Sequence, residues 1–177
     1  MNEILTSHPL IEQILTEQDS LQDDYDLYRN HVYRVFNLTM QLMPSGIADT
    51  DELAVAAAYH DIGIWTAGTF DYLRPSIVLA EKFITENSLL VDKERVKAII
   101  ENHHKLSTYK DDIQVESFRK ADLVDLSSAF FTFGVSRGFI SHLNIAFPSL
   151  GFRRFILRHG ISYFWRHPWN PLPMIKR

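Results

Sequence analysis

Apolar residues recur every three or four positions along nearly the whole chain, which is the spacing of one face of an α-helix. The pattern is clearest where Leu27, Val35, Leu38 and Leu42 follow one another. No segment shows the alternation of a β-strand, and no internal repeat or low-complexity tract interrupts the helical pattern. Because 46% of the 177 residues are hydrophobic and 23% are charged, the chain has enough apolar surface to form a folded core. The sequence therefore predicts an all-α fold.

Capping residues and helix breakers divide this pattern into segments. Asp49 followed by Glu52 has the form of a capping pair for an alanine-rich helix over residues 53–62, which Gly63 is expected to close in a left-handed conformation. Asp92 is expected to cap a later helix. The remaining predictions are helices over about 10–15, 24–43, 75–87 and 115–131, shorter helical pieces over 136–163, a loop over 65–74, and an extended, proline-containing end over 167–173.

Charge is distributed unevenly along the chain. All 22 acidic residues and 11 of the 18 Lys and Arg residues precede Leu126, which gives this part a formal net charge of −11, whereas the remaining 7 bases give the rest a charge of +7. We therefore expect a helical, metal-binding domain over residues 1–130 and a basic, aromatic helical extension over residues 131–177. Phe152, Phe155 and Ile156 are spaced for one helical face, so the extension is expected to pack on the same domain.

The basic and aromatic residues of this extension also fit two other interpretations. Such a segment can bind nucleic acid through phosphate contacts and stacking, or lie on an anionic membrane surface. Packing against the acidic domain is the favoured interpretation, so nucleic acid is not the expected partner. No window approaches the ~18 apolar residues of a membrane span, and no secretory signal precedes the first helix, so a cytoplasmic protein is expected. A homo-oligomer is compatible with the sequence.

Ionisable residues interrupt four of the apolar helical patterns. They are His31, the pair His60-Asp61, the pair His103-His104, and Asp122. Such groups are rarely buried unless they are paired or bound to a metal. The chain has no cysteine, so these imidazoles and carboxylates are the available ligands, and the set suits a divalent ion such as Mn, Fe, Co, Ni, Zn or Mg.

The spacing within each pair limits how it can bind one ion. Adjacent helical residues diverge by about 100°, so His60 and Asp61 can reach one ion together only near a helix end. By the same argument, both cannot point the same way, so one of His103 and His104 is expected to support a ligand from outside or to face solvent, and His103 is favoured as the inner residue because it continues an apolar stripe. Asp125 shares a helical face with Asp122, and a cap, a hydrogen-bond partner or a functional role all remain open for it.

Four short segments carry a family resemblance. YRNHVYRVF, AAAYHDIGI, AIIENHHKL and FRKADLVDL, in this order, resemble the HD superfamily of metal-dependent phosphohydrolases over residues 24–128. The resemblance implies an all-α fold with His31, His60, Asp61 and Asp122 as metal ligands. It also implies that His103 and His104 form an additional motif, found in members with expanded, often two-metal sites.

The match has two departures and one weaker alternative. Two-metal relatives commonly have another histidine between the two motifs, and residues 62–102 contain none. Some cyclic-dinucleotide phosphodiesterases have a lysine after HDIG, where this chain has Ile64. The segment HDIGIWTAGTFDYLRPSI is also similar to the cyanamide-hydratase branch, whose members hydrate a small nitrogenous compound.

The resemblance implies a hydrolase of a nucleotide or another small phosphate ester. A divalent ion would supply an activated water, and Asp61 or Asp122 would accept its proton. A small anionic substrate needs further positive partners, for which we predict Lys105, Arg119 and Arg137, while Arg34 fits either a substrate contact or a salt bridge. The alternatives are a cyanamide-hydratase-like enzyme and a non-catalytic module that binds anions through the basic, aromatic extension.

Overall fold

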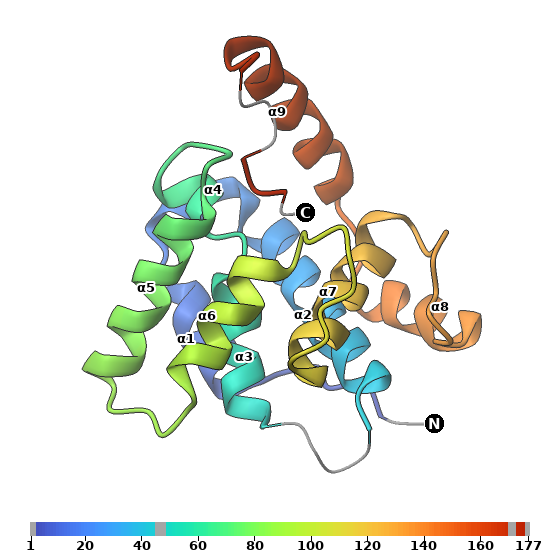
Figure 1. Ribbon diagram of the computed structural model, residues 1–177. Helices are drawn as coiled ribbons and strands as arrows, with labels where there is room; N and C mark the ends of the chain where they lie inside the picture. The colour runs from blue at the N-terminus through green and yellow to red at the C-terminus, as the bar shows by residue number, and fades with distance from the viewer. Residues whose placement is uncertain (1–2, 45–48, 170–172, 176–177) are drawn as a thin grey trace.

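The computed structural model describes residues 3–44, 49–169 and 173–175, and it confirms the all-α prediction (Figure 1). No strand occurs within these ranges. The elements in chain order are α1 (Pro9–Thr16), the 3₁₀ helix η1 (Asp19–Asp24), α2 (Tyr25–Leu42), α3 (Thr50–Tyr59), α4 (Gly63–Thr66), α5 (Leu73–Glu86), α6 (Lys93–Asn102), α7 (Ile113–Leu126), α8 (Arg137–Ala146) and α9 (Phe152–Arg166).

Helix α3 lies at the centre of the bundle and packs against α1, α2, α5 and α6 (Figure 1). A helix that is apolar on all sides must be surrounded by other elements, and four small residues of α3, Ala54, Ala56, Ala57 and Ala58, are completely buried. Beside α3, α2 makes its most extensive contact with α7, although about 90 residues separate them in the sequence. This arrangement brings the end of α3 close to the middle of α2 and α7.

Carboxylates cap several helices, as the sequence predicts for two of them. Asp49 accepts hydrogen bonds from the first backbone N–H groups of α3, and Asp92 does the same for α6. Glu52, however, does not complete a capping pair. Its buried carboxylate instead accepts hydrogen bonds from Arg95 at 3.2 Å and from Gln114 at 3.0 Å. Glu52 therefore links α3 to α6 and α7.

Two helices end earlier than the sequence predicts, and Gly63 has another role. Helix α3 ends at Tyr59, and Gly63 has no positive φ but begins the short helix α4. A Cβ atom on Gly63 would lie 2.5 Å from the carbonyl oxygen of Tyr72, so the position requires glycine because the two backbones approach closely. Helix α7 ends at Leu126 rather than near residue 131, since Ser128 and the residue after it adopt positive φ values that a helix does not contain.

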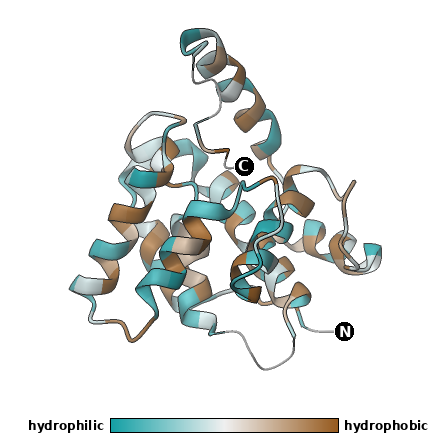
Figure 2. Ribbon diagram, in the orientation of Figure 1, coloured by the Kyte–Doolittle hydropathy of each residue, from teal (hydrophilic) through white to brown (hydrophobic). Residues whose placement is uncertain are grey.

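Helix α9 begins in the core and then extends away from the bundle (Figure 1). Phe152 is completely buried, and Phe155 stacks on Trp65 with ring centroids 5.1 Å apart. Polar and apolar residues alternate along the rest of α9 (Figure 2), and Leu157 and Ile161 are exposed. Of the segment expected to be extended, residues 168–169 form a turn and residues 170–172 lie outside the described ranges. No helix in the described part of the chain is long and apolar enough to cross a membrane.

Candidate metal centre

The histidines and aspartates that the sequence singles out come together from four helices, α2, α3, α6 and α7. His31 lies in the middle of α2, His60 and Asp61 follow α3, and Asp122 lies in the last two turns of α7. His60 is the residue that caps the C-terminal end of α3, so the chain turns there and both members of the pair reach the same space. The sequence predicted this position at a helix end. All four side chains are buried.

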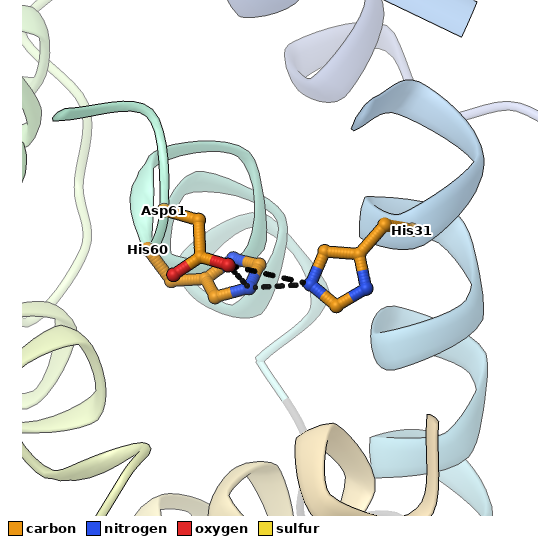
Figure 3. A group of neighbouring side chains, drawn as sticks. All are labelled: His31, His60 and Asp61. Carbon is orange, nitrogen blue, oxygen red and sulfur yellow. Dashed lines mark hydrogen bonds and ion pairs between the residues drawn. The ribbon is translucent and has the colours of Figure 1, made fainter. Parts of the chain in front are cut away.

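The shortest approach in the cluster is between His31 and His60. Their Nε2 atoms lie 2.9 Å apart, and Oδ2 of Asp61 lies 3.7 Å from the first and 3.6 Å from the second (Figure 3). Asp122 completes the group, with Oδ1 3.6 Å from Nε2 of His31. Four potential ligand atoms thus surround one small volume.

The opposite nitrogens of the rings show which atoms carry protons. Nδ1 of His60 lies 2.7 Å from the carbonyl oxygen of Ala57, and Nδ1 of His103 lies 2.7 Å from that of Ile100. A carbonyl oxygen only accepts, so both Nδ1 atoms donate, and in a neutral ring Nε2 is then an unprotonated electron-pair donor. Nδ1 of His31 donates in the same way to a carboxylate. Three Nε2 lone pairs therefore face the cluster.

The carboxylates of Asp61 and Asp122 add negative charge to the cluster and donate no hydrogen bond to it. Oδ1 of Asp61 and Oδ1 of Asp122 are buried and have no hydrogen-bond partner. Unpartnered buried carboxylate oxygens cost several kcal/mol unless a cation offsets them. A divalent metal ion is the cation that both carboxylates and all three imidazoles can share, so the residues present fit such an ion.

The His103-His104 pair differs from the prediction that one ring faces away. Helix α6 ends at Asn102, so the 100° divergence of a regular helix no longer applies, and the two rings lie with centroids 4.0 Å apart. Nε2 of His103 lies 3.3 Å from Oδ1 of Asp61, and Nδ1 of His104 lies 3.3 Å from Oδ2 of Asp122. Asp61 thus belongs to two sets of three ligand atoms, one with His31 and His60 and one with His103 and His104.

The comparison with protein-family models agrees with this geometry. The model described as HD domain matches residues 28–127, which is more than half of the chain and includes all of these residues. The chain belongs to the HD domain family. Membership indicates a metal-dependent hydrolase, and HD domains bind divalent metal ions. The searches of curated proteins and of solved structures found no match.

Burial and neighbouring groups set the protonation of His60, Asp61 and His104. Burial outweighs the opposing charge of Asp61 and lowers the pKa of His60 to about 4, so its ring is neutral at neutral pH. Burial opposes the ionisation of Asp61, but the surrounding imidazoles, His60 foremost, hold its pKa well below the usual value. Burial also disfavours a charge on His104, yet its hydrogen bond to Asp122 raises its pKa.

The role of Asp125, which the sequence left open, is to hold His31 in place. Its Oδ2 lies 2.7 Å from Nδ1 of His31, and its two oxygens also accept a bidentate pair of bonds from Arg34 at 2.7 and 2.9 Å. Arg34 is 1% exposed and donates its remaining bonds to the carbonyl oxygens of Phe147 and Pro148. Arg34 is therefore a salt-bridge partner of Asp125, and its donors are not available to a substrate.

A cavity of about 610 Å³ opens from the candidate metal centre toward α9. His103, His104 and Asp122 line its inner end, and the predicted anion-binding residues Lys105 and Arg119 also line it. The other two predicted substrate contacts, Arg34 and Arg137, are not among the lining residues, and Arg137 lies exposed at the start of α8.

Two aromatic residues near the centre have no motif in the sequence that marks them. The hydroxyl of Tyr72 lies 2.8 Å from Nε2 of His104 and 3.4 Å from Nε2 of His103. Phe152 stacks on His31 with ring centroids 3.8 Å apart. The helical spacing of Phe152 indicates a buried face, but only the folded chain shows that this face covers His31.

Proposed function

We propose that the chain is a metal-dependent phosphohydrolase that hydrolyses a small phosphate ester with water. The observation that carries this proposal is the buried group of three imidazole lone pairs and two carboxylates, with no proton donor among them. Membership of the HD domain family, which is typical of metal-dependent phosphohydrolases, supports it. A nucleotide is the substrate that the sequence resemblance favours.

His31, His60, Asp61 and Asp122 would hold the ion, with His103 and His104 beside it. A bound divalent ion lowers the pKa of a coordinated water toward ~7 and offsets charge that develops at phosphorus. Asp61 and Asp122 each have an oxygen without a hydrogen bond, so either carboxylate is able to accept a proton from the attacking water. Lys105 and Arg119 line the adjoining cavity, where cationic side chains stabilise an anionic ester.

Metal analysis tests the ligand set directly. The purified chain should contain a divalent ion, and the variants His60→Ala and Asp61→Ala should lose it. His142→Ala is the matched control, because His142 lies exposed on α8, away from the cavity, and should retain the ion. A wild-type protein that binds no divalent ion after dialysis against Mn, Fe, Co, Ni, Zn and Mg would contradict the proposal.

The reaction is tested with a panel of phosphate esters, assayed with each ion in turn. Release of inorganic phosphate that depends on the ion and is lost in Asp61→Ala supports a phosphohydrolase. Turnover of cyanamide or another nitrile alone would instead support the hydratase alternative. Salt-sensitive binding of anionic polymers that persists without metal, with no turnover, would support the non-catalytic module.

A further inference from the structure

The cavity beside the candidate metal centre has two ends of different chemistry. Its inner end is polar, because His103, His104 and Asp122 lie there. Its long sides are formed by α7, through Leu123 and its neighbour Leu126, and by one face of α9. A volume of about 610 Å³ lies within the ~300–1,000 Å³ of sites that bind small organic molecules.

The side formed by α9 is apolar along its whole length. Ile156, Leu157, Gly160, Ile161, Phe164 and Trp165 succeed one another at helical spacing and all line the cavity. Leu157 and Ile161 are 64% and 51% exposed, although both are apolar and lie on the same face of α9. A contiguous exposed apolar surface of this kind marks a binding site. Since this surface continues directly into the metal-ligating residues, its occupant is a molecule that also reaches them.

The cavity offers few partners for a polar substrate. Apart from the cluster residues, Lys105 and Arg119 are the only charged side chains among the described residues that line it. Arg119 already donates bonds of 2.8 Å to both carboxylate oxygens of Glu116 and a bond of 3.1 Å to the carbonyl oxygen of Lys105. The base and ribose of a nucleotide would leave their hydrogen-bonding groups unpaired against α9, which costs affinity.

We propose that the substrate is the phosphate monoester of a bulky apolar alcohol, with an alkyl, isoprenoid or aryl group. This inference rests on the proposed hydrolase function. The phosphate lies beside His103, His104 and Asp122, and the apolar group lies along α9 against Leu157 and Ile161. In the reaction, an oxygen of water forms a new bond to phosphorus, the bond from phosphorus to the alcohol oxygen breaks, and the alcohol leaves with one proton of the water.

A series of alkyl phosphates tests this selectivity. The value of kcat/KM is measured for methyl, butyl, hexyl and octyl phosphate, all below their critical micelle concentrations, and for adenosine monophosphate. Burial of each added methylene group should raise kcat/KM two- to fourfold, and therefore at least about tenfold between butyl and octyl phosphate. Equal values across the series, or faster turnover of the nucleotide than of octyl phosphate, would overturn the inference but leave the hydrolase function standing.

A pair of variants locates the effect on α9. Ile161→Gln places a polar group in the cavity and should lower kcat/KM for octyl phosphate at least about fivefold, with little change for methyl phosphate. Ile145→Gln is the matched control, because Ile145 is 74% exposed on α8 and does not line the cavity. An equal effect of Ile161→Gln on both esters, or no effect on either, would contradict binding along α9.

Binding of the non-hydrolysable alkylphosphonates separates this inference from the proposed function. Calorimetry of methyl- to octylphosphonate with metal-loaded protein should show an affinity that increases with the length of the alkyl chain. The Ile161→Gln variant should bind octylphosphonate more weakly than the wild type does. If this dependence is found while no ester is hydrolysed, the cavity has the proposed selectivity and the hydrolase function is wrong. If esters are hydrolysed while phosphonate affinity is independent of chain length, the apolar substrate is wrong and the hydrolase stands.

Discussion

Nδ1 of His31 donates a hydrogen bond of 2.7 Å to the carboxylate of Asp125, and this bond fixes the direction of the opposite nitrogen. Because a buried ion pair with Arg34 holds Asp125 in turn, the ring of His31 cannot rotate without losing this hydrogen bond. Nε2 therefore points at Nε2 of His60 before any ion binds. A carboxylate behind a ligating histidine also increases the electron density on the ligating nitrogen.

Asp125→Asn should weaken metal binding about 10- to 100-fold, because the amide keeps the shape of the carboxylate but not its charge. Calorimetric titration of the metal-free protein with Mn or Zn gives the dissociation constant. Asp111→Asn, an exposed change of the same kind, is the control and should bind as the wild type does. Equal affinities of the Asp125→Asn variant and the wild type would show that Asp125 does not act through His31.

Phe152→Ala should destabilise the fold by about 3–5 kcal/mol, because it removes a completely buried ring and leaves a cavity beside His31. The free energy of unfolding is measured by urea denaturation. Phe130→Ala, at a position that is 81% exposed, should change it by less than about 0.5 kcal/mol. If the two variants lose the same stability, α9 does not begin in the core as described.

Gly63→Ala should destabilise the fold by about 1–3 kcal/mol, because the added Cβ would meet the carbonyl oxygen of Tyr72 at 2.5 Å and Ser76 Oγ at 2.9 Å. The control is Gly138→Ala in α8, where no atom lies within 4 Å and alanine favours the helix. Thermal unfolding should show a lower Tm for the first variant and an unchanged or higher Tm for the second. If the Tm of Gly63→Ala is equal to or higher than that of Gly138→Ala, the close approach of Gly63 to Tyr72 does not require glycine.

Features that depend on nearby residues were readable from the sequence. The caps Asp49 and Asp92 act on the next turn of their own helices, so local spacing was enough to predict them. The adjacency of His60 and Asp61 predicts a helix end, because two adjacent residues cannot otherwise share an ion. The same reasoning failed for His103-His104, since nothing local showed that α6 ends at Asn102.

Features that depend on distant residues were not readable. Arg34 pairs with Asp125, which is 91 positions away, and no spacing on its own helix distinguishes this partner from a substrate. The close approach that requires Gly63 involves Tyr72 from the following helix segment, so the sequence suggested a turn instead. The apolar cavity exists only where α9 faces α7 and the end of α6, so its walls could be predicted as helices but not as a binding surface.

Asp112→Asn should lower stability at neutral pH and lose this effect in acid. Burial opposes the charge of Asp112, but a hydrogen bond of 2.7 Å from Arg95 and two backbone N–H donors lower its pKa below the usual value. A carboxylate whose pKa is lower in the folded state stabilises the fold above its unfolded pKa, and this contribution disappears as the pH falls through the folded pKa. Asparagine retains the helix cap, so the variant reports the charge alone.

The expected loss for Asp112→Asn is a few tenths to about 1 kcal/mol at pH 7, because Arg95 is 37% exposed and the pair is partly screened by water. Urea denaturation at intervals from pH 7 to pH 3 should show the two stability curves converging below the unfolded pKa of about 3.8. Asp111→Asn makes the same change in net charge at an exposed neighbouring position and controls for long-range repulsion. A difference that stays constant down to pH 3, or that grows in acid, would show that the carboxylate of Asp112 is not stabilised by Arg95.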